Sequence, residues 1–360
     1  MTTGTSPMTA NRVTQVFRCA VSLLAAALIV TACSHRPHEH HEQLVVFGTL
    51  VDITIFDADD ESIARASAGI TADLNRLHRT WHAWETSTLT AINDRFAHGE
   101  GAIVDAEGMR ILRRAQELSI ASGGLFNPAV GKLIELWGFH QDDAPKGPPP
   151  PAEVVAELVA KNPQMSDLTF SDTAVTSSNP DVQLDLGAFA KGYAVDRAIG
   201  IVRAAGIENA IVNAGGDLRA IGHHGGRPWR IGIRNPGGPG ILASVEVTGD
   251  ESVFTSGTYE RYFDYEGTRY SHIIDPRSGY PADGATSVTV IHTNGATADA
   301  AATALLVAGP EHWANVARQM GIENVMLVDK GNNIHMTLKM AQRVQFEGEA
   351  PSVVIVADPP

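Results

Sequence analysis

Two segments that lie far apart in the sequence have patterns that suit a shared site in the folded protein. The first runs from Asp185 to Asp196 and reads Asp-Leu-Gly-Ala-Phe-Ala-Lys-Gly-Tyr-Ala-Val-Asp. This pattern predicts a strand end, a tight glycine turn and a helix start, with Lys191 in the first turns of the helix. The second, Thr297-Ala-Asp-Ala-Ala-Ala-Thr303, predicts another helix start. Asp299 and Thr303 are four residues apart and therefore share one helix face.

These residue types indicate chemistry on a phosphate. A carboxylate and a hydroxyl on one helix face form the kind of hard oxygen site that Mg²⁺ prefers. A lysine near a helix N-terminus is a natural partner of a phosphate group. Asp and Thr near a helix start often only cap the helix. Their coexistence with Asp185, Lys191 and His272 favours a metal-assisted reaction on a phosphate-bearing substrate.

Length and charge restrict the class of protein. The chain has 360 residues, which is enough for one large domain or two modest ones. Its formal net charge of -14 argues against a nucleic-acid-binding protein, which would present a basic face. Phosphate ligands remain compatible with this charge, because a local lysine or Mg²⁺ can override the global field.

The N-terminus has the pattern of a targeting segment. Two arginines precede an apolar run, Ala20 to Val30, that is too short for a membrane span. The run ends in Ile-Val-Thr-Ala-Cys33, which resembles the lipobox of a bacterial lipoprotein. We therefore expect residues 1–32 to be a signal peptide and Cys33 to carry the lipid; the alternative is an ordinary signal peptide with a chance cysteine. Cys19 would leave with the signal, which excludes cysteine chemistry in the mature chain.

A polar tether, residues 33–43, is predicted between this anchor and the folded domain. It contains several histidines, which are typical either of a metal-scavenging tract or of a solvated spacer. We favour the spacer because so short a tract lacks fixed geometry. Residues 44–357 are expected to form the catalytic domain.

Hydrophobic periodicity in the domain predicts helices and strands without strict alternation, which indicates an α+β fold, with two subdomains as an option. Helices are predicted at 60–79, after Asp105, at 151–161, 188–205, 296–307 and 311–320; strands are predicted at 44–56, 168–170, 182–186, 210–213, 229–234, 243–247, 269–274, 286–292 and 353–356.

Three further motifs and one tryptophan are ambiguous when each is taken alone. Asn213-Ala-Gly-Gly-Asp217 is either a ligand-approaching glycine turn or a plain turn. The segment from Ser256 to Tyr262 either lines a site or forms an ordinary hairpin. His272, in a strand predicted to end at Asp275-Pro276, is a candidate general base or a structural histidine, and its neighbours Asp275 and Arg277 favour the functional role. Trp84 is a candidate for stacking on a flat ring, although the sequence alone favours core packing.

Taken together and in order, these segments resemble the ApbE family of FAD:protein FMN transferases from about residue 44 to about residue 310. The motifs that carry the resemblance are Phe47-Gly-Thr49, Ser87-Thr-Leu-Thr-Ala-Ile-Asn93, Phe126-Asn-Pro-Ala-Val-Gly131, Leu136-Trp-Gly-Phe139, the Asp185 to Asp196 segment, Asn213 to Asp217, Thr255 to Tyr262, His272 to Pro281 and Ala298 to Thr303.

The resemblance implies the family's flavin transferase fold and its reaction. FAD is split at its pyrophosphate with Mg²⁺, FMN is transferred to a Thr or Ser hydroxyl of a target protein, and AMP leaves. The rival interpretations are an FAD pyrophosphatase that releases FMN and AMP, and a lipoprotein that stores FAD without turnover.

The resemblance also implies roles for individual residues. Asp299 and Thr303 would bind Mg²⁺ through their side chains, and Ala188 and Ala302 through their backbone carbonyls. His272 would deprotonate the acceptor hydroxyl. The residues implied in FAD binding are Phe47, Trp84, Leu125, Phe126, Asn127, Asp185, Lys191 and Ile273. Phe47, Trp84 and Asn127 stand where many members have Met, Tyr and Asp, respectively.

The resemblance implies a partner and a location as well. The acceptor would be a membrane or secreted redox protein, such as a subunit of an RNF-type complex or of a Na⁺-translocating NADH:quinone reductase. The lipid anchor would hold the enzyme at the periplasmic side of a bacterial membrane.

Overall fold

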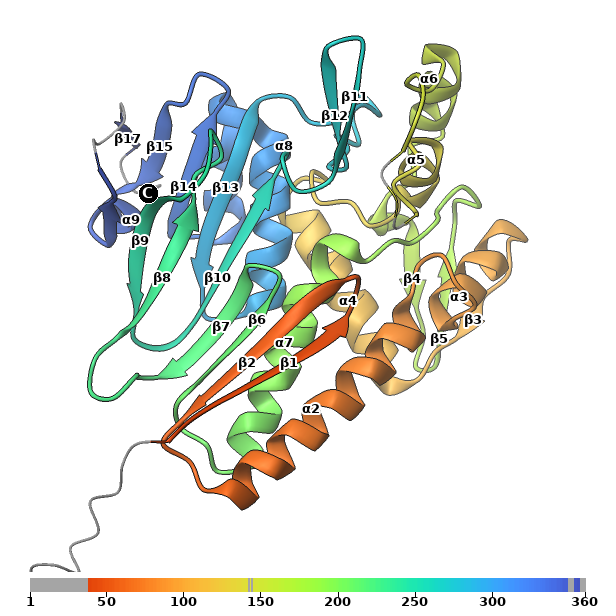
Figure 1. The fold of residues 1–360 in the computed structure, drawn as a ribbon. Helices are drawn as coiled ribbons and strands as arrows, with labels where there is room; N and C mark the ends of the chain where they lie inside the picture. Colours follow the sequence, from red (N-terminus) through yellow and green to blue (C-terminus); the bar gives the residue numbers. More distant parts are fainter. Residues whose placement is uncertain (1–37, 142, 144, 349–352, 357–360) are drawn as a thin grey trace, which may run out of the picture. The chain divides into compact units, whose positions relative to one another are not determined.

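The computed structural model describes residues 38–141, 143, 145–348 and 353–356 of the chain (Figure 1). The predicted signal peptide, the lipidation site Cys33 and residues 34–37 of the tether lie outside the described residues. The chain divides into two units, Met1–His38 and Glu39–Pro360, and every described helix and strand belongs to the second.

Nine strands of the described chain form a central sheet in the order β1-β2-β6-β7-β10-β13-β14-β15-β17 (Figure 1). Neighbouring strands are antiparallel except for β15 and β17, which are parallel. The bounds are β1 Glu39–Val46, β2 Thr49–Phe56, β6 Ala210–Ala214, β7 Asp217–Gly222, β10 Gly249–Gly257, β13 Ala285–His292, β14 Asn324–Asp329, β15 Ile334–Thr337 and β17 Val353–Val356.

The two faces of this sheet are covered by different layers. Helices α2 (Asp60–Trp81), α7 (Gly187–Ala204) and α8 (Gly295–Met320) cover one face, and α4 (Ala106–Ala121) packs against α8. A small sheet in the order β16-β9-β8 covers the other face. Because strand side chains alternate between faces, the neighbours Val253 and Phe254 of β10 belong to different hydrophobic cores. These layers confirm the predicted α+β fold.

The remaining elements are short. Their bounds are α3 Thr88–Ala97, β3 Ala102–Ile103, α5 Gly131–Leu136, α6 Ala152–Ala160, the 3₁₀ turn η1 Met165–Asp167, β4 Leu168–Phe170, β5 Ala174–Ser177, β8 Trp229–Arg234, β9 Ile241–Val247, β11 Tyr262–Tyr265, β12 Thr268–Ser271, α9 Leu338–Ala341 and β16 Val344–Phe346. A third buried cluster, which includes Trp137 and Phe263, joins the β11–β12 hairpin to α5. Within the described residues, no helix combines the length and the apolar character that a membrane crossing needs.

The predicted long helices are confirmed. Asp59 caps α2 by accepting a hydrogen bond from the backbone N–H of Ser62, and Asp105 caps α4 through the N–H of Gly108. The apolar stripe of α2, Ile63 to Leu77, is buried against the sheet layer. In α8 the two predicted helical segments form one element with a break at Gly309, where φ is 68° and Pro310 follows.

The single strand predicted at residues 44–56 is wrong, because the chain folds into the β1–β2 hairpin there. Phe47 and Gly48 form its turn, both with positive φ. The ladder pairs β1 with the full length of β2, from Glu39 opposite Phe56 to Val46 opposite Thr49. Strand β1 therefore begins at Glu39, inside the segment expected to be a spacer, and its polar side chains lie on the edge strand of the sheet.

Two other strand predictions need correction. Residues 182–186 form no strand, because their backbone bonds go to a loop: the N–H of Asp185 donates to the carbonyl of Pro128 at 2.8 Å. The strand predicted at 269–274 ends at Ser271, since its partner β11 begins opposite that residue at Tyr262. His272 consequently lies in the loop after β12 rather than inside a strand.

Candidate active site

The two motifs that the sequence singles out meet where α7 crosses α8. The backbone N–H of Gly192 in α7 donates to Oδ2 of Asp299 in α8 at 2.9 Å. In a regular helix this N–H would donate to the carbonyl of Ala188. Ala188 itself departs from helical geometry, with φ of -87° and ψ of 18°. The start of α7 is therefore built around Asp299, and the carbonyl of Ala188 lies at the break.

Lys191 is held by a carboxylate that sequence reasoning did not assign to the site. Its Nζ forms an ion pair with Oδ2 of Asp217, whose Oδ1 accepts from the N–H of Thr255 at 2.9 Å. Asp217 is buried and follows Gly215 and Gly216, which both have positive φ. In the sequence, the glycine turn before Asp217 indicated a possible ligand site. The ion pair between Asp217 and Lys191 is evident only in the folded structure.

The charges of this cluster are not balanced among its own side chains. Asp299 is 5% exposed, and burial raises the pKa of its carboxyl even though the nearby Lys191 ammonium opposes the shift. Burial by itself lowers the pKa of Lys191, but the carboxylates of Asp217 and Asp299 outweigh it, so the net shift is upward. Two buried carboxylates thus share one ammonium group, an arrangement that a divalent cation would complete.

The donor atoms around Asp299 fit Mg²⁺. The hydroxyl of Thr303, one helical turn after Asp299, lies 3.0 Å from the hydroxyl of Ser256, so this part of α8 offers neutral oxygen ligands as well as the carboxylate. The break at Ala188 supplies a carbonyl, whereas Ala302 is buried inside α8. No group of three or more His, Cys, Asp or Glu side chains in the described part of the chain could hold a metal ion. A magnesium site here would therefore combine one carboxylate, a hydroxyl and backbone oxygens.

His272 lies at the base of the β11–β12 hairpin and its ring is fixed by the backbone. Nδ1 is 3.1 Å from the carbonyl of Arg261, the residue just before β11, and the N–H of His272 donates to the same carbonyl at 3.0 Å. An N–H on Nδ1 facing this carbonyl leaves Nε2 as the acceptor nitrogen. Burial lowers the pKa of His272 to about 4, and the charges of Arg261 and Lys191 add to the effect. The ring is therefore neutral at pH 7 and able to accept a proton.

This gives a pH prediction. Between pH 7.5 and 5.5 the imidazole NMR signals of His272 should stay those of a neutral ring, whereas exposed His98, whose pKa Asp94 raises, should titrate in the same spectra. A His272 midpoint near 6.5 would contradict the half-buried, neutral ring. Between pH 6.5 and about 4, the His272 ring takes up a proton more readily in the unfolded chain than in the folded one. Lowering the pH through this window therefore reduces the free energy of unfolding.

Asp185 joins the segment after α4 to the start of α7. Its Oδ1 accepts from the N–H of Gly187 at 2.7 Å, while its backbone pairs with Pro128. Burial raises the pKa of its carboxyl, with Arg261 and the side chain of Trp84 near enough to oppose the shift. The structure thus brings Asp185, Trp84 and Arg261 close together, and the carbonyl of Arg261 is the group that orients His272.

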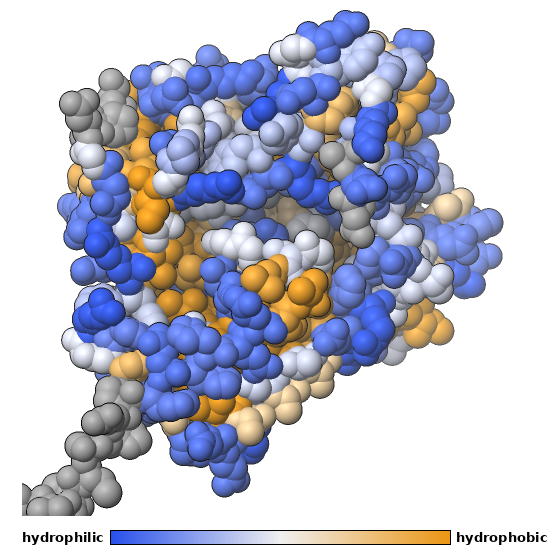
Figure 2. All heavy atoms as spheres, in the orientation of Figure 1, coloured by the Kyte–Doolittle hydropathy of each residue, from blue (hydrophilic) through white to orange (hydrophobic). Residues whose placement is uncertain are grey.

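Aromatic and imidazole rings lie next to this neighbourhood. The ring of Phe47 is 5.5 Å from that of His78, which is 5.2 Å from His82, and Trp84 is 5.4 Å from His140. Figure 2 shows apolar side chains on the surface around the β1–β2 hairpin, where Val45 is largely exposed. Trp84 and Phe47 are both half-buried, so the core packing that the sequence favoured for Trp84 is only partly realised.

Four of the residues predicted to contact FAD have buried side chains. Leu125, Phe126 and Ile273 belong to the main hydrophobic core. The side chain of Asn127 is engaged with the carbonyl of Pro163 and the N–H of Ala129, at 2.9 and 3.1 Å. Any contact of these residues with a ligand would therefore use mainly their backbone.

Comparisons with known proteins identify the family of the chain. The sequence model of the ApbE family matches residues 47–326 of the chain. The chain belongs to the ApbE family. It is similar to the FAD:protein FMN transferase of Rhodobacter capsulatus, with 45% identity over 320 residues that make up 89% of this chain and 61% of that protein. An FAD:protein FMN transferase of Klebsiella pneumoniae is 36% identical over 242 residues, 66% of this chain and 73% of that protein.

Solved ApbE structures share the fold. The ApbE protein of Thermotoga maritima superposes with a TM-score of 0.77 at 34% sequence identity, covering 87% of this chain and 100% of that one. The flavin transferase ApbE of Vibrio cholerae superposes with a TM-score of 0.75 at 28% identity, covering 86% and 100%. The ApbE-like fold predicted from the motifs is therefore confirmed.

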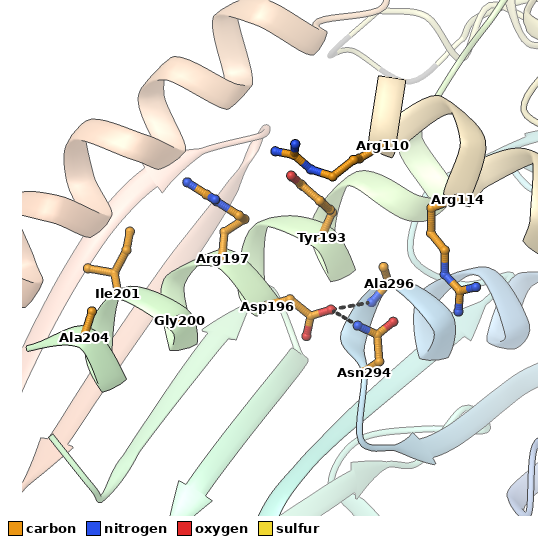
Figure 3. A pocket seen from close by; sticks show the side chains of 10 residues that line it. All are labelled: Arg110, Arg114, Tyr193, Asp196, Arg197, Gly200, Ile201, Ala204, Asn294 and Ala296. Atoms are coloured by element: carbon orange, nitrogen blue, oxygen red, sulfur yellow. Dashed lines mark hydrogen bonds between the residues drawn. The ribbon is translucent and has the colours of Figure 1, made fainter. Parts of the chain in front are cut away.

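A cavity of about 640 Å³ on this ApbE-family domain lies between α4, α7 and the start of α8 (Figure 3). Its lining includes Arg110, Tyr193 and Arg197, but neither Lys191 nor Asp299. Arg197 is engaged with Asp73 at 2.9 Å, and Tyr193 donates to Glu107 at 3.2 Å. The lining charges are thus partly neutralised by neighbouring carboxylates.

Proposed function

We propose that the chain is an Mg²⁺-dependent FAD:protein FMN transferase that attaches FMN to a Thr or Ser hydroxyl of a target protein and releases AMP. The observation that carries this proposal is the joined cluster of Lys191, Asp217 and Asp299, in a chain whose relatives are named as FAD:protein FMN transferases. Its excess of buried negative charge favours a divalent cation, and a cation there favours a phosphate ligand.

In the proposed reaction the acceptor oxygen bonds to the FMN phosphorus of FAD, the pyrophosphate bond breaks, and AMP leaves with the bridging oxygen. Bound Mg²⁺ would neutralise developing charge on the phosphates. Asp299, Thr303 and the backbone carbonyl of Ala188 would hold the Mg²⁺ ion. The backbone carbonyl of Ala302 would be a further ligand. Lys191 would contact the phosphates from its place on Asp217. His272 is neutral and backbone-oriented, so it can accept the acceptor's proton.

The proposed FAD site uses two groups of residues. Phe47 and Trp84 present half-buried rings for the isoalloxazine system, and Asp185 presents a carboxyl beside Trp84. Residues 125–127 and Ile273 would contribute backbone groups. The chain spans 61% of the length of its Rhodobacter capsulatus relative, so its activity, substrate and acceptor belong to one proposal.

The deciding experiment mixes the purified protein with FAD, Mg²⁺ and a small acceptor domain that carries a flavinylation threonine. We expect the intact mass of the acceptor to rise by one FMN, and the gain to vanish when Mg²⁺ is chelated. AMP and FMN accumulating without a mass gain would instead favour the pyrophosphatase. FAD that remains intact with Mg²⁺ and acceptor present would favour a storage protein.

We propose, further, that Cys33 carries a lipid that holds the enzyme on the periplasmic side of a bacterial membrane. There it would reach acceptors such as the subunits of an RNF-type complex or of a Na⁺-translocating NADH:quinone reductase. The support is the sequence pattern that ends at Cys33. Cys33→Ala should move the protein from the membrane to the soluble fraction, whereas Cys19→Ala should not. Membrane retention of the Cys33 variant would contradict the anchor.

A further inference from the structure

Helices α7 and α8 carry the same short pattern where they cross. In α7 the pattern is Gly192-Tyr-Ala-Val-Asp196, and in α8 it is Gly295-Ala-Thr-Ala-Asp299. Each aspartate accepts a hydrogen bond from the backbone N–H of the other helix's glycine. Oδ2 of Asp299 is 2.9 Å from the nitrogen of Gly192, and Oδ1 of Asp196 is 2.8 Å from the nitrogen of Gly295. We call this pair of Gly-x-x-x-Asp segments the reciprocal clamp.

The two glycines let the helix backbones touch. A Cβ on Gly192 would lie 2.3 Å from the carbonyl oxygen of Gly295, and a Cβ on Gly295 would lie 2.8 Å from the carbonyl oxygen of Gly192. Both contacts are with backbone, which cannot rotate away as a side chain can. The absence of side chains at both positions is therefore what brings each aspartate within hydrogen-bonding distance of the opposite helix.

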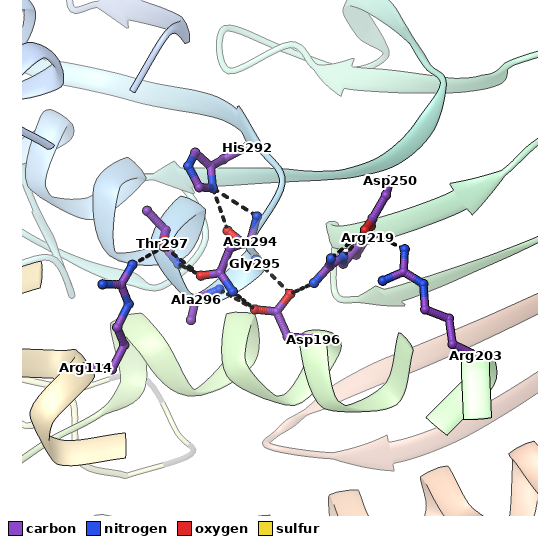
Figure 4. A network of polar contacts seen from close by, with 10 residues as sticks. All are labelled: Arg114, Asp196, Arg203, Arg219, Asp250, His292, Asn294, Gly295, Ala296 and Thr297. Atoms are coloured by element: carbon purple, nitrogen blue, oxygen red, sulfur yellow. Dashed lines mark hydrogen bonds and ion pairs between the residues drawn. The ribbon is translucent and has the colours of Figure 1, made fainter. Parts of the chain in front are cut away.

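Asp196 is held by several donors (Figure 4). Besides Gly295, it accepts from Nδ2 of Asn294 at 2.7 Å and from the N–H of Ala296 at 3.1 Å. Arg219, itself bound to Asp250, forms an ion pair with the same carboxylate. Asp196 thus ties the first turn of α8 to α7, one turn away from Asp299. On its other side Asp196 borders the cavity of Figure 3.

We infer that Asp196 is a positioning residue for the metal-binding carboxylate of Asp299. By holding the first turn of α8 in register with α7, it keeps Asp299 on the N–H of Gly192, which lies one turn after the break at Ala188. The inference rests on the proposed function, in which Asp299 binds Mg²⁺. Residues that orient a metal ligand typically change metal affinity by about 10- to 100-fold when they are replaced.

The test uses Asp196→Asn in the full chain, because an amide keeps the shape but its nitrogen cannot accept the N–H groups that one carboxylate oxygen now holds. We expect the Mg²⁺ concentration for half-maximal AMP release to rise at least about tenfold, with the rate at saturating Mg²⁺ changed far less. The matched control is Asp250→Asn, which removes the other carboxylate on Arg219 without touching α8. It should leave the half-saturating Mg²⁺ concentration within about twofold.

Hydrogen exchange supplies a readout that is independent of turnover. The amide of Gly192 should exchange faster in Asp196→Asn than in wild type or in Asp250→Asn, because its acceptor Asp299 is no longer held in register. If Asp196→Asn fails to fold, Asn294→Ala takes its place. It removes one of the four donors to Asp196 together with the side chain that caps α8 through Thr297, and both metal affinity and Gly192 exchange should shift in the same direction.

The outcomes separate this inference from the proposed function. Wild-type protein that never releases AMP with Mg²⁺ and acceptor would overturn the proposed function and, with it, the metal role of the clamp. Active wild type with an unchanged Mg²⁺ requirement in Asp196→Asn would overturn the inference alone, and reduce Asp196 to a helix cap. An equal rise of the half-saturating Mg²⁺ concentration in Asp196→Asn and Asp250→Asn would also overturn the inference. Such a rise would reflect the ion pairs of Arg219 and not the reciprocal clamp.

Discussion

Replacing Asp299 with alanine is expected to lower Mg²⁺-dependent AMP release by more than about a hundredfold. Replacing a residue that only orients a metal ligand lowers activity by up to about a hundredfold, so removing a ligand itself should have a larger effect. The substitution removes a buried carboxylate that would ligate the metal, and it also frees the Gly192 N–H. Lys191 and Asp217 would then neutralise each other, and no excess negative charge would remain to attract a divalent cation. The measurement is AMP release across a Mg²⁺ titration.

Two further variants make this result interpretable. Asp94→Ala changes an exposed carboxylate of α3 and should leave the Mg²⁺ titration unchanged. Asp299→Asn keeps an oxygen for the Gly192 N–H while it removes the charge, so it should fold like wild type and still lose activity. Full Mg²⁺-dependent activity in the alanine variant would remove Asp299 from the metal site.

The second large effect is expected from Gly192→Ala. The new Cβ would lie 2.3 Å from the carbonyl oxygen and 2.6 Å from the carbonyl carbon of Gly295, so α7 and α8 must separate. Overpacking of this kind typically costs about 1–3 kcal/mol, and we expect the free energy of unfolding to fall by at least the upper part of that range because both contacts are with backbone. Separation of the helices should also pull Asp299 from Gly192 and lower AMP release.

Gly200→Ala on the same helix is the matched control. A Cβ at Gly200 meets nothing within 4 Å, and this exposed glycine has helical neighbours on both sides. Alanine there should stabilise the protein by about 0.5–1 kcal/mol through helix propensity. Denaturant unfolding measured on both variants checks the contrast. Equal stability of the two variants would mean that the helices can move apart at little cost.

Sequence periodicity predicted the elements whose stability is local. The apolar stripe and the Asp59 cap of α2 act within a few residues of one another, and α4 is likewise bounded by the Asp105 cap and by Gly123 and Gly124, which both have positive φ. The predictions failed where pairing decides the structure. The β1–β2 turn at Phe47-Gly48 and the end of β12 at Ser271 depend on which strand lies alongside, and hydrophobic alternation does not contain that information.

Among the site residues, too, those with a local sequence pattern were predicted, and those placed by long-range contacts were not. Asp299, Thr303 and Lys191 were predicted as neighbours from their types and spacing. The structure brings Lys191 close to Asp299, and Thr303 follows Asp299 by one turn of α8. Asp217 and Ser256 were quoted in motifs but not assigned to the site, since each reaches it through a contact with a residue far away in sequence.

The sequence by itself determined the family, the α+β class and the residue types available for phosphate and metal chemistry, because these follow from motifs and from local periodicity. Only the tertiary structure decided the charge balance and the register of the site. Asp217 and Asp299 are buried around the Lys191 ammonium only because β7, α8 and α7 meet. The lowered pKa of His272 likewise depends on its burial and on its position beside Arg261 in the fold. The contact between Gly192 and Gly295 that aligns α7 with α8 is a matter of backbone distance in space, which no local pattern specifies.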